Sequence, residues 1–162
     1  MRTNNPARKA CLLLALCMVP GNGMSAGTAG DQVAIVVRAD VPVDNLSFND
    51  IKKLLLGDRQ FWNPSLRVTL LISAPGSRER DVVLKTIYQM SEAQFRQYWI
   101  AKVFRAEAAS GPRIVYSSEM AAELAGSIPG AVAFVDAAQV PRGLKVLKID
   151  GRLPGDKDYP LR

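Results

Sequence analysis

Apolar and polar positions alternate in blocks along this chain, and the blocks predict strands and helices in turn. Five short runs of aliphatic and β-branched residues without strict polar alternation indicate buried strands, at residues 33–37, 68–72, 113–116, 131–135 and 144–149. Stretches with apolar residues at helical spacing lie between them and predict helices at about 48–56, from 77 to about 90, at 91–106, and from 117 through 124.

Serine residues mark the starts of these helices. Ser47, Ser77, Ser91 and Ser117 each stand just before a helical stretch, where a side-chain oxygen accepts a hydrogen bond from a free backbone N–H. Gly57 follows the first helix and supplies the left-handed conformation that commonly ends one. The order of the elements predicts an α/β fold with a central, mostly parallel sheet and helices on both faces.

The two ends of the chain differ in character from this middle part. Arg2, Arg8 and Lys9 precede an apolar run at 11–19 and small residues at 21–30, which is the layout of a secretory signal peptide. We therefore expect a signal peptide at 1–29, one domain at 30–150, and a polar, mostly unstructured tail at 151–162.

Two details of the leader leave alternatives open. Cleavage after Ala26 and cleavage after Ala29 both fit the small residues there. A lipoprotein signal ending at Cys17 is disfavoured, because Leu16 stands where a small residue is expected.

Composition narrows the chemistry. The chain has no histidine, and both of its cysteines lie in the leader, so Ser-His-Asp and Cys-His catalysis and zinc sites built from His or Cys are excluded. The leader holds three of the 21 basic residues and none of the 15 acidic ones, so its removal lowers the net charge from +6 to +3. That balance does not suggest nucleic-acid binding. We expect an exported protein that is not an enzyme and has no cofactor or metal.

The turn between the second strand and the second helix is the candidate site. It contains Ser73, Gly76 and Ser77, and Arg78 opens the helix. The first N–H groups of a helix lack partners and carry the positive end of its dipole, so an anion could bind there, with hydroxyl donors beside it. The alternative is a plain helix cap formed by Ser77.

Three segments resemble the periplasmic phosphate-binding protein family, the receptors of phosphate ABC transporters with the type II periplasmic binding fold. Residues 46–57 followed by Trp62 are similar to the family's "Leu-Ser…Ile-Phe-Leu-Gly-Lys…Trp" helix and turn. Residues 128–135 are similar to its "Pro-Gly-Ala-Ile-Gly-Tyr-Val" strand, and residues 73–77 fall at its phosphate loop, Arg-Ser-Asp-Gly-Ser-Gly-Thr. The resemblance covers residues 33–149 and implies a short, single-lobe member, matching the second lobe of such a receptor.

The phosphate loop departs from the family pattern. Only Gly76 and Ser77 match it, while Ser73 and Pro75 stand where the family has arginine and aspartate. The arginine gives a paired, charge-assisted contact to phosphate, and proline does not replace the aspartate that accepts a phosphate proton. The resemblance therefore implies weak binding of phosphate or another small oxyanion, in transport or sensing, unless a homodimer supplies a second wall.

A second hypothesis is a ligand-free interaction or signalling module that docks on a membrane sensor or transporter. The loss of the family's arginine and aspartate from the phosphate loop favours it, whereas the retained Gly76-Ser77 helix start favours anion binding. The remaining polar candidates have structural interpretations. Ser117 and Ser118 form a second candidate anion site, but helix capping explains them equally well. Asp136 follows the end of a strand, where ligands often bind in α/β sheets, and is interpreted as a surface carboxylate. A solvated basic face accounts for Lys52, Lys53, Arg59 and Arg67. Trp62 is expected to be a core or interface aromatic residue rather than a platform for a ligand.

Overall fold

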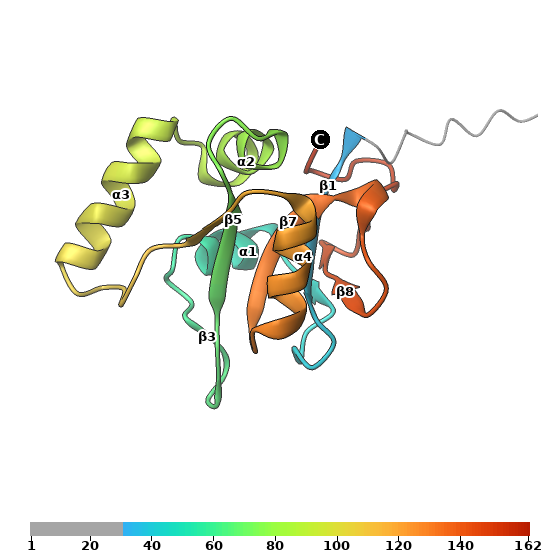
Figure 1. Cartoon of the computed structure of the whole chain (residues 1–162), viewed down its shortest axis with the longest axis horizontal. Coiled ribbons are helices and arrows are strands. Elements are labelled where there is room, and N and C mark those ends of the chain that lie inside the picture. The colour runs from blue at the N-terminus through green and yellow to red at the C-terminus, as the bar shows by residue number, and fades with distance from the viewer. Residues whose placement is uncertain (1–30) are drawn as a thin grey trace, which may run out of the picture.

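The computed structural model describes residues 31–162, so the predicted signal peptide lies outside the described residues. Strands and helices alternate as the sequence predicts (Figure 1). The strands are β1 Val33–Arg38, β2 Asn45–Leu46, β3 Phe61–Asn63, β4 Leu66–Arg67, β5 Thr69–Ser73, β6 Arg113–Val115, β7 Ala131–Asp136, β8 Leu144–Val146 and β9 Lys148–Ile149. The helices are α1 Phe48–Leu55, α2 Arg78–Val83, the π-helical turn η2 Leu84–Tyr88, α3 Glu92–Phe104, α4 Ser118–Ser127 and the 3₁₀ turn η3 Ala137–Gln139.

The central sheet has five strands in the order β6-β5-β7-β1-β8. Strand β5 pairs in parallel with β6 and β7, whereas β1 runs antiparallel to both β7 and β8. The sheet is therefore mixed, and the predicted mostly parallel sheet is wrong at β1. The connection from β1 to β5 contains the β3–β4 hairpin as well as α1, and it delivers β5 in the direction opposite to β1.

Both faces of the sheet are covered, as predicted. Side chains of β1 alternate between the faces: Val33 and Ile35 belong to the larger buried cluster, which also contains residues of α1 and η2, and Ala34 and Val36 belong to the cluster formed with α4. The α4 face is built largely from alanine, which lets this helix lie close to the sheet. In Figure 1, α4 crosses in front of β7, while α3 stands away from the sheet at the side of the molecule.

The serine caps are confirmed. Ser47, Ser77, Ser91 and Ser117 each have extended backbone and accept from the N–H three residues later. At α3 the side chain of Gln94 returns the bond to the Ser91 N–H, which completes a capping box.

The C-terminal tail is packed, which contradicts the expected unstructured tail. Tyr159 and Leu161 are both fully buried, and the carbonyl of Leu161 accepts from the Val33 N–H at 2.9 Å. Figure 1 shows this end of the chain beside β1. The prediction was based on the polar composition of the tail, but two apolar residues within it are enough to anchor it to the domain.

Removal of one hydroxyl tests how firmly the tail is anchored. The Tyr159 hydroxyl donates to the Val33 carbonyl at 2.9 Å, and burial raises the pKa of this phenol far above its usual value, so it remains a donor. We expect Tyr159→Phe to lower the free energy of unfolding by about 1 kcal/mol, measured by urea denaturation. Tyr116→Phe is the control, because Tyr116 is 79% exposed and its replacement should change nothing. Equal stabilities of the two variants would contradict the anchoring role.

Candidate functional site

The turn between β5 and α2 brings the four predicted residues together. Ser73 ends β5 and is 8% exposed, so it offers little surface to a ligand. Gly76 has φ +85°, and a Cβ added there would meet no atom within 4 Å, so the tip of the turn is open. The Ala74 N–H donates to the Val115 carbonyl at 2.8 Å, which fixes the base of the turn against β6.

The start of α2 combines a cap with unpaired amides. Ser77 accepts from the Arg80 N–H at 3.4 Å, and its own N–H donates to the Ala74 carbonyl at 3.2 Å. Within residues 31–162, no hydrogen bond occupies the N–H groups of Arg78 and Glu79. Both sequence interpretations therefore describe this turn: Ser77 caps the helix, and two amides stay open beside it.

The Arg78 side chain faces carboxylates rather than the open tip. Its terminal nitrogens lie 3.3 Å from Asp136 and 3.5 Å from Asp31. Both nitrogens are shielded from solvent, and neither makes a hydrogen bond of normal geometry in the described part of the chain. An anion at the tip would reach this guanidinium only after the side chain moved away from Asp136.

Arg80, two residues on, supports the turn from inside. It is 2% exposed, and it makes two hydrogen bonds of 2.7 and 2.8 Å to the carboxylate of Glu92. A third bond of 2.9 Å goes to the Ser73 carbonyl, and the guanidinium lies 4.8 Å from the Phe95 ring centre. The hydrogen bonds from Arg80 lower the pKa of Glu92. Arg80 is thus a structural residue and adds no free positive charge.

At the second candidate anion site, the start of α4, the serine side chains are engaged in other contacts. Ser117 accepts from the Met120 N–H at 3.1 Å as the cap of α4, and the Ser118 hydroxyl donates to the Glu79 carboxylate at 3.4 Å. Asp136 accepts from the Ala138 N–H at 2.8 Å in addition to facing Arg78. The predicted core position of Trp62 is confirmed, since it is 5% exposed and donates to the Gly130 carbonyl at 2.8 Å.

Residues 31–162 contain no helix that is both long and apolar enough to cross a bilayer. Nor do they contain a group of three or more metal-ligating His, Cys, Asp or Glu side chains.

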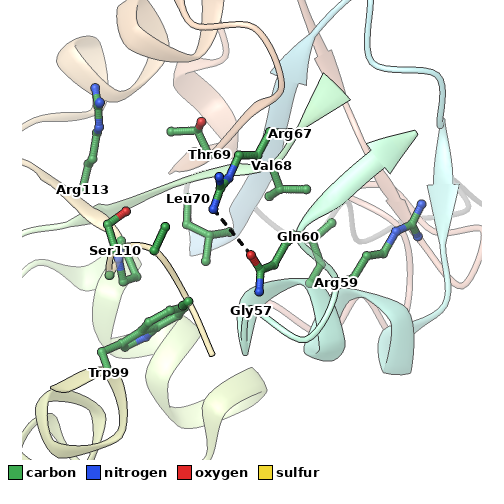
Figure 2. A pocket seen from close by; sticks show the side chains of 15 residues that line it. Gly57, Arg59, Gln60, Arg67, Val68, Thr69, Leu70, Trp99, Ser110 and Arg113 are labelled. Atoms are coloured by element: carbon green, nitrogen blue, oxygen red, sulfur yellow. Dashed lines mark hydrogen bonds between the residues drawn. The ribbon is translucent and has the colours of Figure 1, made fainter. Parts of the chain in front are cut away.

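A pocket that the sequence did not reveal lies at the start of β5, at the opposite end of the strand from the turn. A cavity of about 280 Å³ lies between the end of α1, the β3–β4 hairpin, α3 and residues 108–113 (Figure 2). Arg59 and Arg67, which the sequence placed on a solvated face, line it together with Arg113. One feature of the sequence could have indicated this pocket. Arg67 lies just before β5 and Arg113 begins β6, and the starts of these two adjacent parallel strands lie at the same edge of the sheet.

Comparison with known proteins shows which solved structures have a similar fold. No protein-family model matches the sequence, and no curated protein sequence matches it either. Among solved structures, a substrate-binding protein assigned to phosphate ABC transport from Clostridium perfringens, with bound phosphate, matches at a TM-score of 0.61 and 17% identity. An ABC-type phosphate transport receptor from Vibrio cholerae matches at 0.60 and 16%, and PstS from Borrelia burgdorferi matches at 0.58 and 12%.

The three matches cover similar shares of each chain. Each spans 76% of this chain but only 46%, 48% and 49% of the respective receptor. At such low identity the likeness concerns the fold, and the fold is the one that the sequence motifs implied. The described part of the chain therefore has an α/β fold that resembles one lobe of a phosphate ABC transporter substrate-binding protein.

Proposed function

We propose that this chain is exported to the periplasm and binds a small oxyanion such as phosphate weakly, at the turn between β5 and α2. The observation that carries the proposal is the open tip: Gly76 is unobstructed, and the N–H groups of Arg78 and Glu79 have no partner among the described residues. The tip follows the carboxyl end of a strand in the sheet, where α/β proteins commonly bind ligands. Export rests on the leader sequence at 1–29.

Local charge argues for low affinity. The positive charge of Arg78 is offset by Asp136 and Asp31, and Arg80 is offset by Glu92. Glu79 adds a negative charge in the first turn of α2. Backbone amides alone then hold the anion, and the open tip leaves one side of it in water. We expect a dissociation constant of about 1 mM or weaker.

Releasing Arg78 should strengthen binding. Asp136→Asn removes the less exposed of its two carboxylate neighbours, and we expect the affinity for phosphate to rise about tenfold, because the guanidinium becomes available for a charge-assisted contact. The measurement is a titration with phosphate and sulfate, followed by calorimetry and by amide NMR shifts at Gly76. Glu123→Gln, an exposed change of equal charge on α4, is the control and should leave the affinity unchanged.

Three outcomes would contradict the proposal. The first is an absence of shifts at Gly76 with either anion in both the parent protein and Asp136→Asn. The second is an equal gain in affinity from the Glu123→Gln control, which would show that only net charge matters. The third is micromolar binding by the unmodified monomer, which would refute the electrostatic argument for weak affinity.

The second candidate function is an interaction module that docks on a membrane sensor or transporter. Exposed apolar side chains on α3 favour it: Phe104 is 90% exposed and Ile100 is 68% exposed. A flat thermal-shift response to a panel of oxyanions, together with a co-purifying membrane protein that is lost on Phe104→Gln, would favour this function over anion binding.

A further inference from the structure

The pocket at the start of β5 is separate from the proposed oxyanion turn. Its lining includes Arg67, Val68, Thr69 and Leu70, which precede or begin β5, whereas the oxyanion turn follows the end of the same strand. At about 280 Å³ the cavity lies near the lower end of the range of small-molecule pockets, about 300–1,000 Å³, so it fits a small ligand.

The lining of this pocket is positively charged. Arg59, Arg67 and Arg113 contribute to it, and none of its lining residues is an aspartate or glutamate. In the part of the chain that the structure describes, no carboxylate lies within ion-pair distance of these three guanidinium groups. The pocket therefore carries an uncompensated positive charge, in contrast to the turn around Arg78.

Arg67 is held in place at the pocket. The side-chain amide of Gln60 donates to the Glu107 carbonyl at 2.7 Å, which turns the amide oxygen of Gln60 toward Arg67, 3.5 Å away (Figure 2). The guanidinium also lies 5.8 Å from the ring centre of Phe61. Only one of its five N–H donors is engaged in this way, so the rest of the fork is free for a ligand.

The other two arginines play a lesser part. In Figure 2 the side chains of Arg59 and Arg113 extend away from the centre of the pocket. Arg59 also donates to the carbonyls of Phe61 and Trp62. These two groups raise the local potential, and Arg67 is the anchoring group.

The wall across from Arg67 is apolar and partly aromatic. Trp99 is 6% exposed, so it forms the floor of the pocket with the small part of its side chain that its neighbours leave uncovered. Its six-membered ring lies against Gly57, where an added Cβ would come within 2.9 Å of the indole. Gly111 lies along the same side chain, and Leu54 and Leu70 complete the apolar lining. A ligand that uses this pocket fully therefore needs an apolar body as well as a negative charge.

We propose that this pocket binds a small organic carboxylate with a ring-sized apolar body, its carboxylate on the Arg67 guanidinium and its body against Trp99. The planar fork of an arginine matches the two oxygens of a carboxylate. Inorganic phosphate leaves the apolar wall unused, so it is the weaker ligand here.

Benzoate is a suitable probe, and benzamide is its neutral counterpart of the same shape. We expect benzoate to shift the NMR signals of the Trp99 indole and the Gly111 amide with a dissociation constant of about 1 mM. Benzamide and inorganic phosphate should each bind at least about tenfold more weakly at these signals.

Variants of Arg67 test the anchor. We expect Arg67→Gln to weaken benzoate binding about tenfold, and Arg67→Lys to retain part of the affinity because it keeps the charge but loses the fork. Arg142→Gln, an exposed change of equal charge outside this pocket, should have no effect. The melting temperature of each variant is measured alongside, and if Arg67→Gln does not fold, the comparison of benzoate with benzamide on the unmodified protein decides alone.

The inference would be overturned by equal binding of benzoate and benzamide, by phosphate binding as tightly as benzoate at this pocket, or by unchanged affinity in a folded Arg67→Gln. A short acidic peptide that shifts these signals more strongly than benzoate would replace the small carboxylate with a protein segment as the occupant, and would also overturn it.

Discussion

Replacing Gly130 with alanine is expected to lower the free energy of unfolding by about 4 kcal/mol, a large share of the stability of an ordinary domain. Gly130 has φ +71°, a conformation that costs an L-residue about 1–2 kcal/mol. A Cβ there would lie 2.0 Å from the backbone carbonyl oxygen of Arg67, so the added atom meets main chain rather than a flexible side chain.

The backbone around Gly130 has little freedom to move away from this clash. The Gly130 carbonyl accepts from the Thr69 N–H at 3.1 Å and from the Trp62 indole at 2.8 Å, which fixes the start of β7 against β5 and the β3–β4 hairpin. A shift that relieved the clash would stretch both bonds. The two effects together give the expected loss.

Gly151→Ala separates the two contributions. Gly151 has φ +79°, close to that of Gly130, but a Cβ there would meet nothing within 4 Å. We expect this control to lose only the conformational part, about 1–2 kcal/mol, in urea denaturation. A Gly130→Ala loss no larger than that of Gly151→Ala would contradict the proposed clash.

Most of the secondary structure could be predicted from patterns of residues close together in the sequence. The buried strands at 33–37 and 131–135 and the helix starts at Ser47, Ser77, Ser91 and Ser117 depend on neighbouring residues, and the structure confirms them. The Pro-Gly segment before β7 also has a physical reason, because only glycine fits at 130 beside the Arg67 carbonyl.

Features set by distant contacts were not predictable in the same way. The direction of β1 depends on its pairing with β7, about a hundred residues later, and the short β3–β4 hairpin lies in the connection that reverses the path. The burial of Tyr159 depends on its contact with β1 at the other end of the domain. The composition of a segment does not indicate the pairing of β1 with β7 or the contact of Tyr159 with β1.

The candidate site shows the same division. Sequence placed Ser73, Gly76, Ser77 and Arg78 in one turn, because strand, turn and helix follow each other directly. It gave no means of knowing that Asp136, more than fifty residues later, faces Arg78. The sequence also does not distinguish Arg78, whose side chain is 37% exposed, from Arg80, which is buried.

That difference predicts losses of stability of different size for substitutions at these two positions. We expect Arg80→Met to lower the free energy of unfolding by about 3 kcal/mol, because it removes two hydrogen bonds to Glu92 and leaves the buried Ser73 carbonyl without its donor. Arg78→Met is the matched control. Its side chain is 37% exposed and its carboxylate contacts are longer, so we expect a loss below about 1 kcal/mol.

The pH dependence identifies the origin of the Arg80 effect. Hydrogen bonding from Arg80 lowers the pKa of Glu92 in the folded protein, so this pair stabilises the fold above the pKa of an unfolded glutamate, about 4.3, and the contribution is lost as the pH falls through the lower folded value. Since Glu92 is 37% exposed, solvent screening limits this part to a fraction of the total.

The gap in stability between the parent protein and Arg80→Met should therefore narrow between about pH 5 and pH 3. The remainder of the Arg80 effect, from the Ser73 carbonyl and the Phe95 ring, does not titrate and should persist at acid pH. Urea denaturation across this range measures both parts. A gap for Arg80→Met that is independent of pH would show that the ion pair adds nothing, and that Arg80 supports the turn through the carbonyl and the ring alone.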